Sequence, residues 1–201
     1  MKNLRLSKKF SVVFFFTLVL NSQAQDMELP YYQIPEYPED FGPGNVVARM
    51  IDALGFRYYW ATEGLTEKDL DYSPSEGART SKETLKHIHT MSKMILNAAD
   101  GNPNIRLENP PELSFEEVRK STLGNIKLAS DKIRGKQAEE FEQCNVVFQN
   151  GDRESVYPYW NMINGMLSDC MYHTGQIVLL RRITGNPKNP KVSVFSGRLR
   201  D

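Results

Sequence analysis

The stretch Ser168-Asp169-Cys170-Met171-Tyr172-His173-Thr174-Gly175-Gln176 lies in the last long run of helical periodicity of the chain. Asp169 and His173 are four residues apart, so a helix places both side chains on one face, one turn apart. A carboxylate and an imidazole at this spacing can bind one metal ion, or they can form a simple pair on the helix flank. The spacing alone leaves both interpretations open.

The apolar surroundings of this pair favour a buried role. At about 100° per residue, Asp169 lies about 40° from His173. Apolar side chains lie within about 60° of His173, namely Met162, Met166, Cys170, Ile177 and Leu180. A carboxylate that faces a core is costly unless it is paired, hydrogen-bonded or bound to a metal.

The chain has three histidines, and one of the other two can meet this helix. On the helix expected from residue 80, His87 lies at the edge of the apolar stripe, whereas His89 points about 200° away. A histidine at such an edge is also compatible with an ordinary core or surface position. Glu83, one turn earlier, is already explained by helix capping. Two ligands from one helix and one from another build a metal site with an open position, so we predict that His87, Asp169 and His173 bind a metal.

Four long helices are expected from the periodicity and the capping residues. Thr80 with Glu83, and Ser114 with Glu117, are capping boxes, which mark the starts of two of these helices. The expected helices cover residues 44–64, 80–99, 114–135 and 158–184. The first is expected to bury Val47, Met50, Ile51, Leu54, Tyr58 and Ala61. A short additional turn is expected from Thr66.

The period changes between the third and fourth helices. Residues 145–149 and 153–157 flank Asn150-Gly151, which is the strongest short-range signal for a β-hairpin. The fold class expected from the sequence is therefore all-α, a four-helix bundle over residues 44–187 with a small β-hairpin between helices three and four.

The first 24 residues are typical of a secretory signal peptide. A basic leader precedes a largely apolar stretch of eleven residues from Phe10 to Leu20 and a small-residue cleavage site at Ser22-Gln23-Ala24. The apolar run is too short for a stable membrane anchor, which needs about 20 residues. We therefore expect a secreted or periplasmic protein.

Charge argues against a nucleic-acid partner. Cleavage would remove four of the 25 Lys and Arg residues and none of the 25 Asp and Glu residues, which leaves a mildly acidic chain of 177 residues. Nucleic-acid binding needs clustered basic charge, and none is visible. The expected partner is a small-molecule substrate. Bundles often pair through helix faces, which also allows a homodimer.

The ends of the mature chain are expected to lack helices. Residues 25–43 contain several prolines and no helical period, so we expect an extended segment that lies over the surface or is disordered. Residues 188–201 form a tail that we expect to pack back through Val192, Val194 and Phe195. Cys144 and Cys170 are expected to be two free or buried thiols rather than a disulfide.

The ordered motifs resemble those of a known superfamily. Thr80 to Ile88 on one helix, Asp169-x-x-x-His173-x-Gly175-Gln176-Ile177 on another, and the ending Arg181-Arg182-x-x-Gly185-Asn186-Pro187 resemble the DinB-like superfamily over roughly residues 44–187. That resemblance implies a four-helix bundle whose metal is held by one His from the second helix and a pair from the fourth. The commonest pair is His-x-x-x-His. Asp169 departs from it and resembles the Glu-x-x-x-His pair of mycothiol-dependent maleylpyruvate isomerase.

The resemblance implies a metal-dependent hydrolase or group transferase. Zinc is the first expectation, while two histidines and a carboxylate also suit nickel or iron. Relatives that act on thiols use cytosolic thiols, which makes thiol transfer less attractive for an exported protein. The alternative is a non-catalytic exported helical bundle that binds a ligand or protein partner through Met91, Met94, Met162 and Met166.

Three polar residues near the end of the last helix have two interpretations each. Gln176 is either a residue that orients a metal ligand or an exposed helix residue. Arg181 and Arg182 can attract an anionic substrate, but the interaction of basic residues with the helix dipole is the favoured explanation.

Overall fold

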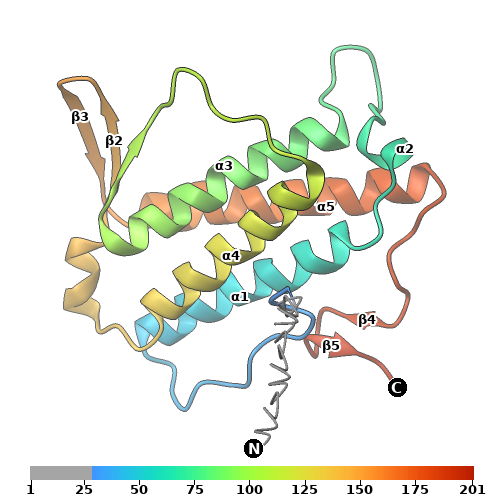
Figure 1. Ribbon diagram of the computed structural model, residues 1–201. Helices are drawn as coiled ribbons and strands as arrows, with labels where there is room; N and C mark the ends of the chain where they lie inside the picture. Colours follow the sequence, from blue (N-terminus) through green and yellow to red (C-terminus); the bar gives the residue numbers. More distant parts are fainter. Residues whose placement is uncertain (1–28) are drawn as a thin grey trace, which may run out of the picture.

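The computed structural model describes residues 29–201 and shows a mostly helical protein (Figure 1). Its long helices are α1 (Pro43–Thr62), α3 (Ser81–Asp100), α4 (Phe115–Ile133) and α5 (Ser168–Ile183). Shorter helical segments are α2 (Glu67–Leu70), the 3-10 helix η1 (Ala138–Gln143) and the π-helix η2 (Met162–Leu167). The predicted signal peptide, residues 1–24, lies outside the described residues.

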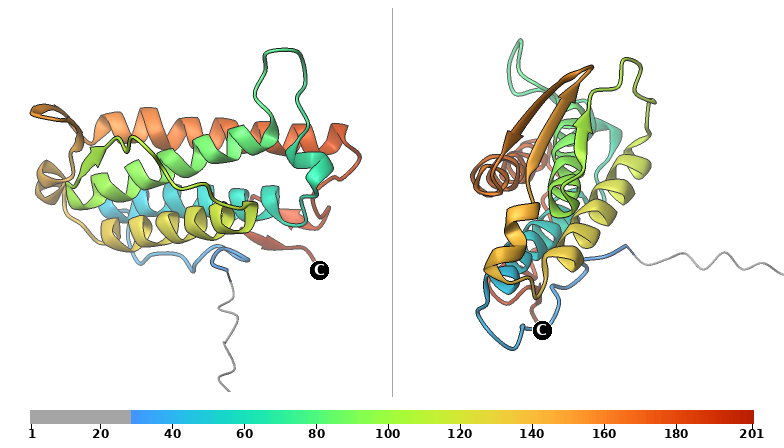
Figure 2. Two further views of the ribbon diagram at one scale, coloured as in Figure 1. Left: turned by 45° about the horizontal axis from the view of Figure 1, so that its top comes forward. Right: turned by 90° about the vertical axis from the view of Figure 1, so that its left-hand side faces the viewer.

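The four long helices pack side by side. α4 lies against α1 and α3, and α5 also lies against both of them. Figure 2 shows α3 and α5 next to one another, with α1 and α4 beneath them. The packing of α5 against α3 brings together the two helices that carry the predicted metal ligands.

The predicted capping boxes are confirmed. The Thr80 hydroxyl accepts a hydrogen bond from the Glu83 amide at 3.1 Å, while the Glu83 carboxylate accepts one from the Thr80 amide at 2.8 Å. Ser114 and Glu117 make the same exchange at the start of α4. These bonds satisfy amides that a helix leaves open, so both helices begin where the sequence predicts.

The core is formed by one face of each long helix. Its fully buried side chains include Ile51, Leu54, Leu85, Ile88, Ile95, Leu123, Ile126 and Ile177. The prediction that Met50 belongs to this face is wrong, because Met50 is 39% exposed. Met50 lies about 100° around the helix from Ile51, which places it at the outer edge of the stripe.

The predicted β-hairpin is present between α4 and α5. Strands β2 (Val146–Asn150) and β3 (Arg153–Tyr157) pair antiparallel, with Asn150 opposite Arg153. Gly151 has φ +60°, which the tight turn requires and glycine adopts at no steric cost. A third strand, β1 (Pro103–Ile105), pairs parallel with β2 and was not predicted. It is too short to show an alternating pattern.

The last helix does not start as a regular α-helix. The predicted helix over residues 158–184 is resolved into η2 and then α5, so a π-helical segment precedes Asp169. The Ser168 hydroxyl donates to the Ile163 carbonyl at 2.8 Å, across this wider turn. π-helical turns inside longer helices are frequent at functional sites.

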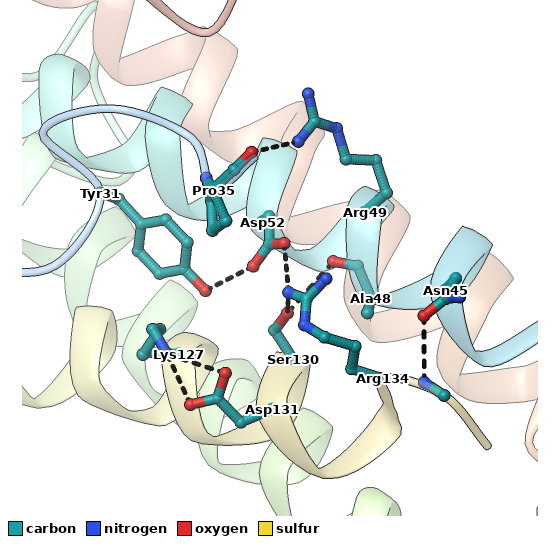
Figure 3. A network of polar contacts seen from close by, with 11 residues as sticks. Tyr31, Pro35, Asn45, Ala48, Arg49, Asp52, Lys127, Ser130, Asp131 and Arg134 are labelled. Atoms are coloured by element: carbon teal, nitrogen blue, oxygen red, sulfur yellow. Dashed lines mark hydrogen bonds and ion pairs between the residues drawn. The ribbon is translucent and has the colours of Figure 1, made fainter. Parts of the chain in front are cut away.

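Residues 29–42 run along α1 and are tied to it by polar contacts (Figure 3). The Tyr31 hydroxyl donates to Asp52 at 3.0 Å, and the Trp60 indole N–H donates to the Tyr32 carbonyl at 3.1 Å. Asp52 is fully buried and also accepts from Arg134 of α4 at 2.7 Å. This segment is therefore held on the surface of the helices.

The C-terminal tail packs back through only one of the three predicted residues. Strands β4 (Val192–Ser193) and β5 (Arg198–Leu199) form a small hairpin. Val192 is buried, but Val194 is 50% and Phe195 100% exposed, so the prediction is wrong for these two. Both lie in the turn between the two strands, which is exposed to solvent.

Both cysteines are free and buried, as predicted. Within residues 29–201, no helix is both long enough and apolar enough to cross a membrane.

Candidate metal centre

The candidate metal centre lies between α3 and α5. His87 is in the second turn of α3, one residue before the buried Ile88, and its side chain is 34% exposed. Asp169 and His173 lie one helical turn apart in the first half of α5. Cys170 and Thr174, each the next residue along, are buried in the core. The three candidate ligands are thus held at the edge of the core by their buried neighbours.

The three predicted ligands converge. The Asp169 carboxylate lies 3.6 Å from Nε2 of His87 through Oδ2, and 3.5 Å from Nε2 of His173 through Oδ1. The two imidazole rings are nearly perpendicular, with centroids 4.9 Å apart. One ligand atom from each residue lies within 4.8 Å of the other two, so these side chains could hold a metal ion.

The separations suit a single ion. Two atoms that each lie about 2.0–2.2 Å from one tetrahedral ion are about 3.3–3.6 Å apart. Each contact of Asp169 is close to this range, but the two contacts use different oxygens of the carboxylate, so a single ion would bind through both oxygens or after a small movement of the side chains. They are longer than good hydrogen bonds, but both lie within the range of an ion pair if the histidines are protonated.

Gln176 orients His173. Its side-chain Oε1 lies 2.7 Å from Nδ1 of His173. Since an amide oxygen can only accept a hydrogen bond, Nδ1 is the donor in this contact, and the other ring nitrogen, Nε2, faces Asp169. In metal sites, a hydrogen-bond acceptor on the ring nitrogen that does not bind the metal fixes the orientation of the histidine. Of the two interpretations of Gln176, the structure therefore supports the orienting role.

The surroundings of His87 favour its neutral form. Burial lowers the pKa of His87, and the positive charges of Arg79 and of His173 when protonated lower it further, while Asp169 acts in the opposite direction. A metal binds the neutral form of imidazole. The environment therefore favours the form of His87 that can bind an ion.

A cavity of about 550 Å³ opens beside His87 and Asp169. Both His87 and Asp169 contribute to its lining, together with Met91 and Met94 of α3 and Met166 of η2. The ligand set therefore faces an open space on one side. Catalytic metal sites have such an open position, whereas structural sites are closed by a fourth protein ligand.

Two other candidate residues have structural roles. His89 lies away from the centre, with Nε2 3.0 Å from the Ser121 hydroxyl of α4. Arg181 is buried and donates to the carbonyls of Trp60 and Ala61 at 3.2 and 3.0 Å. Arg181 thus caps the end of α1, a role that was not predicted, and it also lies in the last turn of α5, as the helix-dipole interpretation requires.

Tyr172 and the π-helical segment were not predicted as parts of this site. The Tyr172 ring packs edge-on against His173, with centroids 5.4 Å apart, and it lines the cavity with Asn164 and Gly165. The pair Asn164-Gly165 inside a helical run is a sequence signal for an irregular turn, because both residues are weak helix formers.

Comparisons of the chain with protein-family models, curated proteins and solved structures find no match. The function proposed below therefore rests on the side chains and their geometry.

Proposed function

We propose that this protein is a metal-dependent hydrolase or group transferase that acts on a small molecule, with one divalent ion held by His87, Asp169 and His173. The observation that carries the proposal is the convergence of these three side chains beside an open cavity. The packing of α1, α3, α4 and α5 supports a four-helix bundle, and the ligand positions on α3 and α5 support membership of the DinB-like superfamily.

The chemistry of the proposed site follows from its ligands. An ion with three protein ligands acts as a Lewis acid and lowers the pKa of water in its open position. His87 and His173 supply neutral nitrogens, and Asp169 supplies one negative charge. Zinc fits this set, and nickel or iron(II) fit it as well. Export after removal of residues 1–24 belongs to the same proposal.

Metal analysis tests the site directly. The full mature chain, purified without chelator, is expected to contain about one equivalent of a divalent metal by elemental analysis. The His173→Ala variant is expected to lose the metal, because only two of the three protein ligands remain. His89→Ala is the matched control, since His89 lies on α3 but outside the centre. Absence of metal from a folded protein, even after addition of zinc, nickel or iron(II), would contradict the proposal.

A second candidate function is ligand binding without catalysis, which the methionine wall of the cavity favours. Under that function His173→Ala would lower the free energy of unfolding by about 1–2 kcal/mol and change nothing else. The same elemental analysis, combined with chemical denaturation, separates the two functions.

A further inference from the structure

The cavity beside the candidate metal centre has a wall of methionines. Met91 and Met94 project from adjacent turns of α3, and Met166 faces them from η2. Met91 is buried, while Met94 and Met166 are partly exposed. Methionine side chains are flexible and polarisable, so they adapt to apolar groups of irregular shape.

The cavity has little positive charge of its own. Among the described residues that line it, Asp169 is the acidic one and none is Lys or Arg. Arg79, whose charge acts on His87, is exposed and does not line the cavity. A divalent ion together with the Asp169 carboxylate would leave one net positive charge at the ligand end. That single charge can neutralise one anionic group and no more.

The polar groups that remain are neutral. Thr90, Asn164 and Tyr172 are exposed residues of the lining. They can hydrogen-bond to a hydroxyl, an amide or a carbonyl, but they cannot compensate a second carboxylate.

We infer that the cavity takes a small molecule with one metal-directed head group, carrying at most one negative charge, and with an uncharged apolar remainder seated on Met91, Met94 and Met166. This inference rests on the proposed metal site. A volume of about 550 Å³ is within the range of about 300–1,000 Å³ that is usual for small-molecule sites. Molecules with several carboxylates are expected to bind poorly, since the lining has no cation to receive them.

The test uses three hydroxamates and the cobalt(II)-loaded full mature chain, whose visible spectrum reports on the metal and its ligands. Acetohydroxamate carries the head group alone, octanohydroxamate adds an apolar tail, and the monohydroxamate of suberic acid has a tail of the same length that ends in a carboxylate. We expect octanohydroxamate to bind at least about tenfold more tightly than acetohydroxamate, because part of its tail is buried. We expect the suberic compound to lose most of this gain.

A methionine replacement locates the effect. Met94→Lys places a cation in the wall, so it is expected to abolish the preference for the apolar tail and to favour the carboxylate tail. Met50→Lys is the matched control, because Met50 lies on α1, is 39% exposed and does not line the cavity. It is expected to leave all three affinities unchanged.

The outcomes separate the two proposals. If cobalt binds but the three wild-type affinities are equal, or the carboxylate tail is preferred, the inference about the substrate is wrong and the metal site stands. The same conclusion follows if Met50→Lys changes the preference as much as Met94→Lys. If the folded protein binds no cobalt, both proposals fall.

Discussion

Nδ1 of His173 lies 2.7 Å from the amide oxygen of Gln176, three residues further along α5. This contact makes Nδ1 of His173 the donor to Gln176 and directs Nε2 towards Asp169. The helix that supplies two predicted metal ligands thus also supplies the residue that orients one of them.

Replacement of Gln176 should weaken metal binding without removing a ligand. Gln176→Ala is expected to lower the affinity for zinc by about 10–100-fold, the usual effect of losing a partner that orients a ligand. Gln176→Glu should retain most of the affinity, because a carboxylate also accepts from Nδ1. Competition with a chromophoric chelator measures both. Gln149→Ala, on the exposed end of β2, is the control. Equal affinities for wild type and Gln176→Ala would refute the orienting role.

Arg181 should matter for stability and Arg182 should not. Arg181→Met leaves the buried carbonyls of Trp60 and Ala61 without this donor, so we expect the free energy of unfolding to fall by about 2–4 kcal/mol. Arg182→Met changes an exposed neighbour and should stay within about 0.5 kcal/mol. Urea denaturation at neutral pH measures both variants. Similar losses in the two would show that the helix dipole, rather than the cap of α1, is the main role of these arginines.

The contact of Tyr31 with Asp52 should stabilise the attachment of the N-terminal segment (Figure 3). Tyr31→Phe keeps the buried ring but removes a donor to a fully buried carboxylate, so we expect a loss of about 1–2 kcal/mol in unfolding free energy. Tyr37→Phe is the matched control, because Tyr37 is 77% exposed. Metal content should be the same in both variants. A loss of metal in Tyr31→Phe would link this network to the candidate centre, contrary to expectation.

Asp69 should make stability depend on acid pH. Burial acts to raise its pKa, but hydrogen bonds from Thr184, Asn186 and Thr66 outweigh burial and lower the pKa from 3.8 to about 2. Because the folded pKa is depressed, the stabilisation is present above about pH 4 and is lost as pH falls through 2.

Asp69→Asn tests this dependence. At pH 7 it is expected to lower the free energy of unfolding by about 2 kcal/mol, and the difference from wild type should shrink as pH falls towards 2. Denaturation curves at several pH values measure it, with Asp71→Asn, an exposed neighbour, as control. A difference that does not change with pH would show that the charge of Asp69 is not the cause.

Local features of the fold could be predicted from the sequence. The starts of α3 and α4 depend on side chains three residues apart, and the turn of the hairpin depends on Asn150-Gly151, so neighbouring residues suffice. Strand β1 could not be predicted in this way. Its three residues are ordered by pairing with β2, which is more than 40 positions away in the chain.

The solvent exposure of residues at the edges of helices and strands was harder to predict than the starts of helices and the hairpin turn. Met50 and Phe195 belong to apolar patterns but are exposed to solvent. The packing of neighbouring elements determines how much of an apolar stripe is buried, and the sequence pattern alone does not show this. Helical periodicity also extends through residues 162–167, although the backbone there is π-helical. Periodicity reports the average direction of side chains and does not resolve one wider turn.

The sequence by itself determined that Asp169 and His173 share a face, since one helical turn sets their separation. Only the tertiary structure decided that His87, on a different helix, lies 3.6 Å from Asp169. It also decided that Arg181 caps α1. Positions within a turn follow from backbone geometry, whereas the distance between α3 and α5 depends on how the whole core packs.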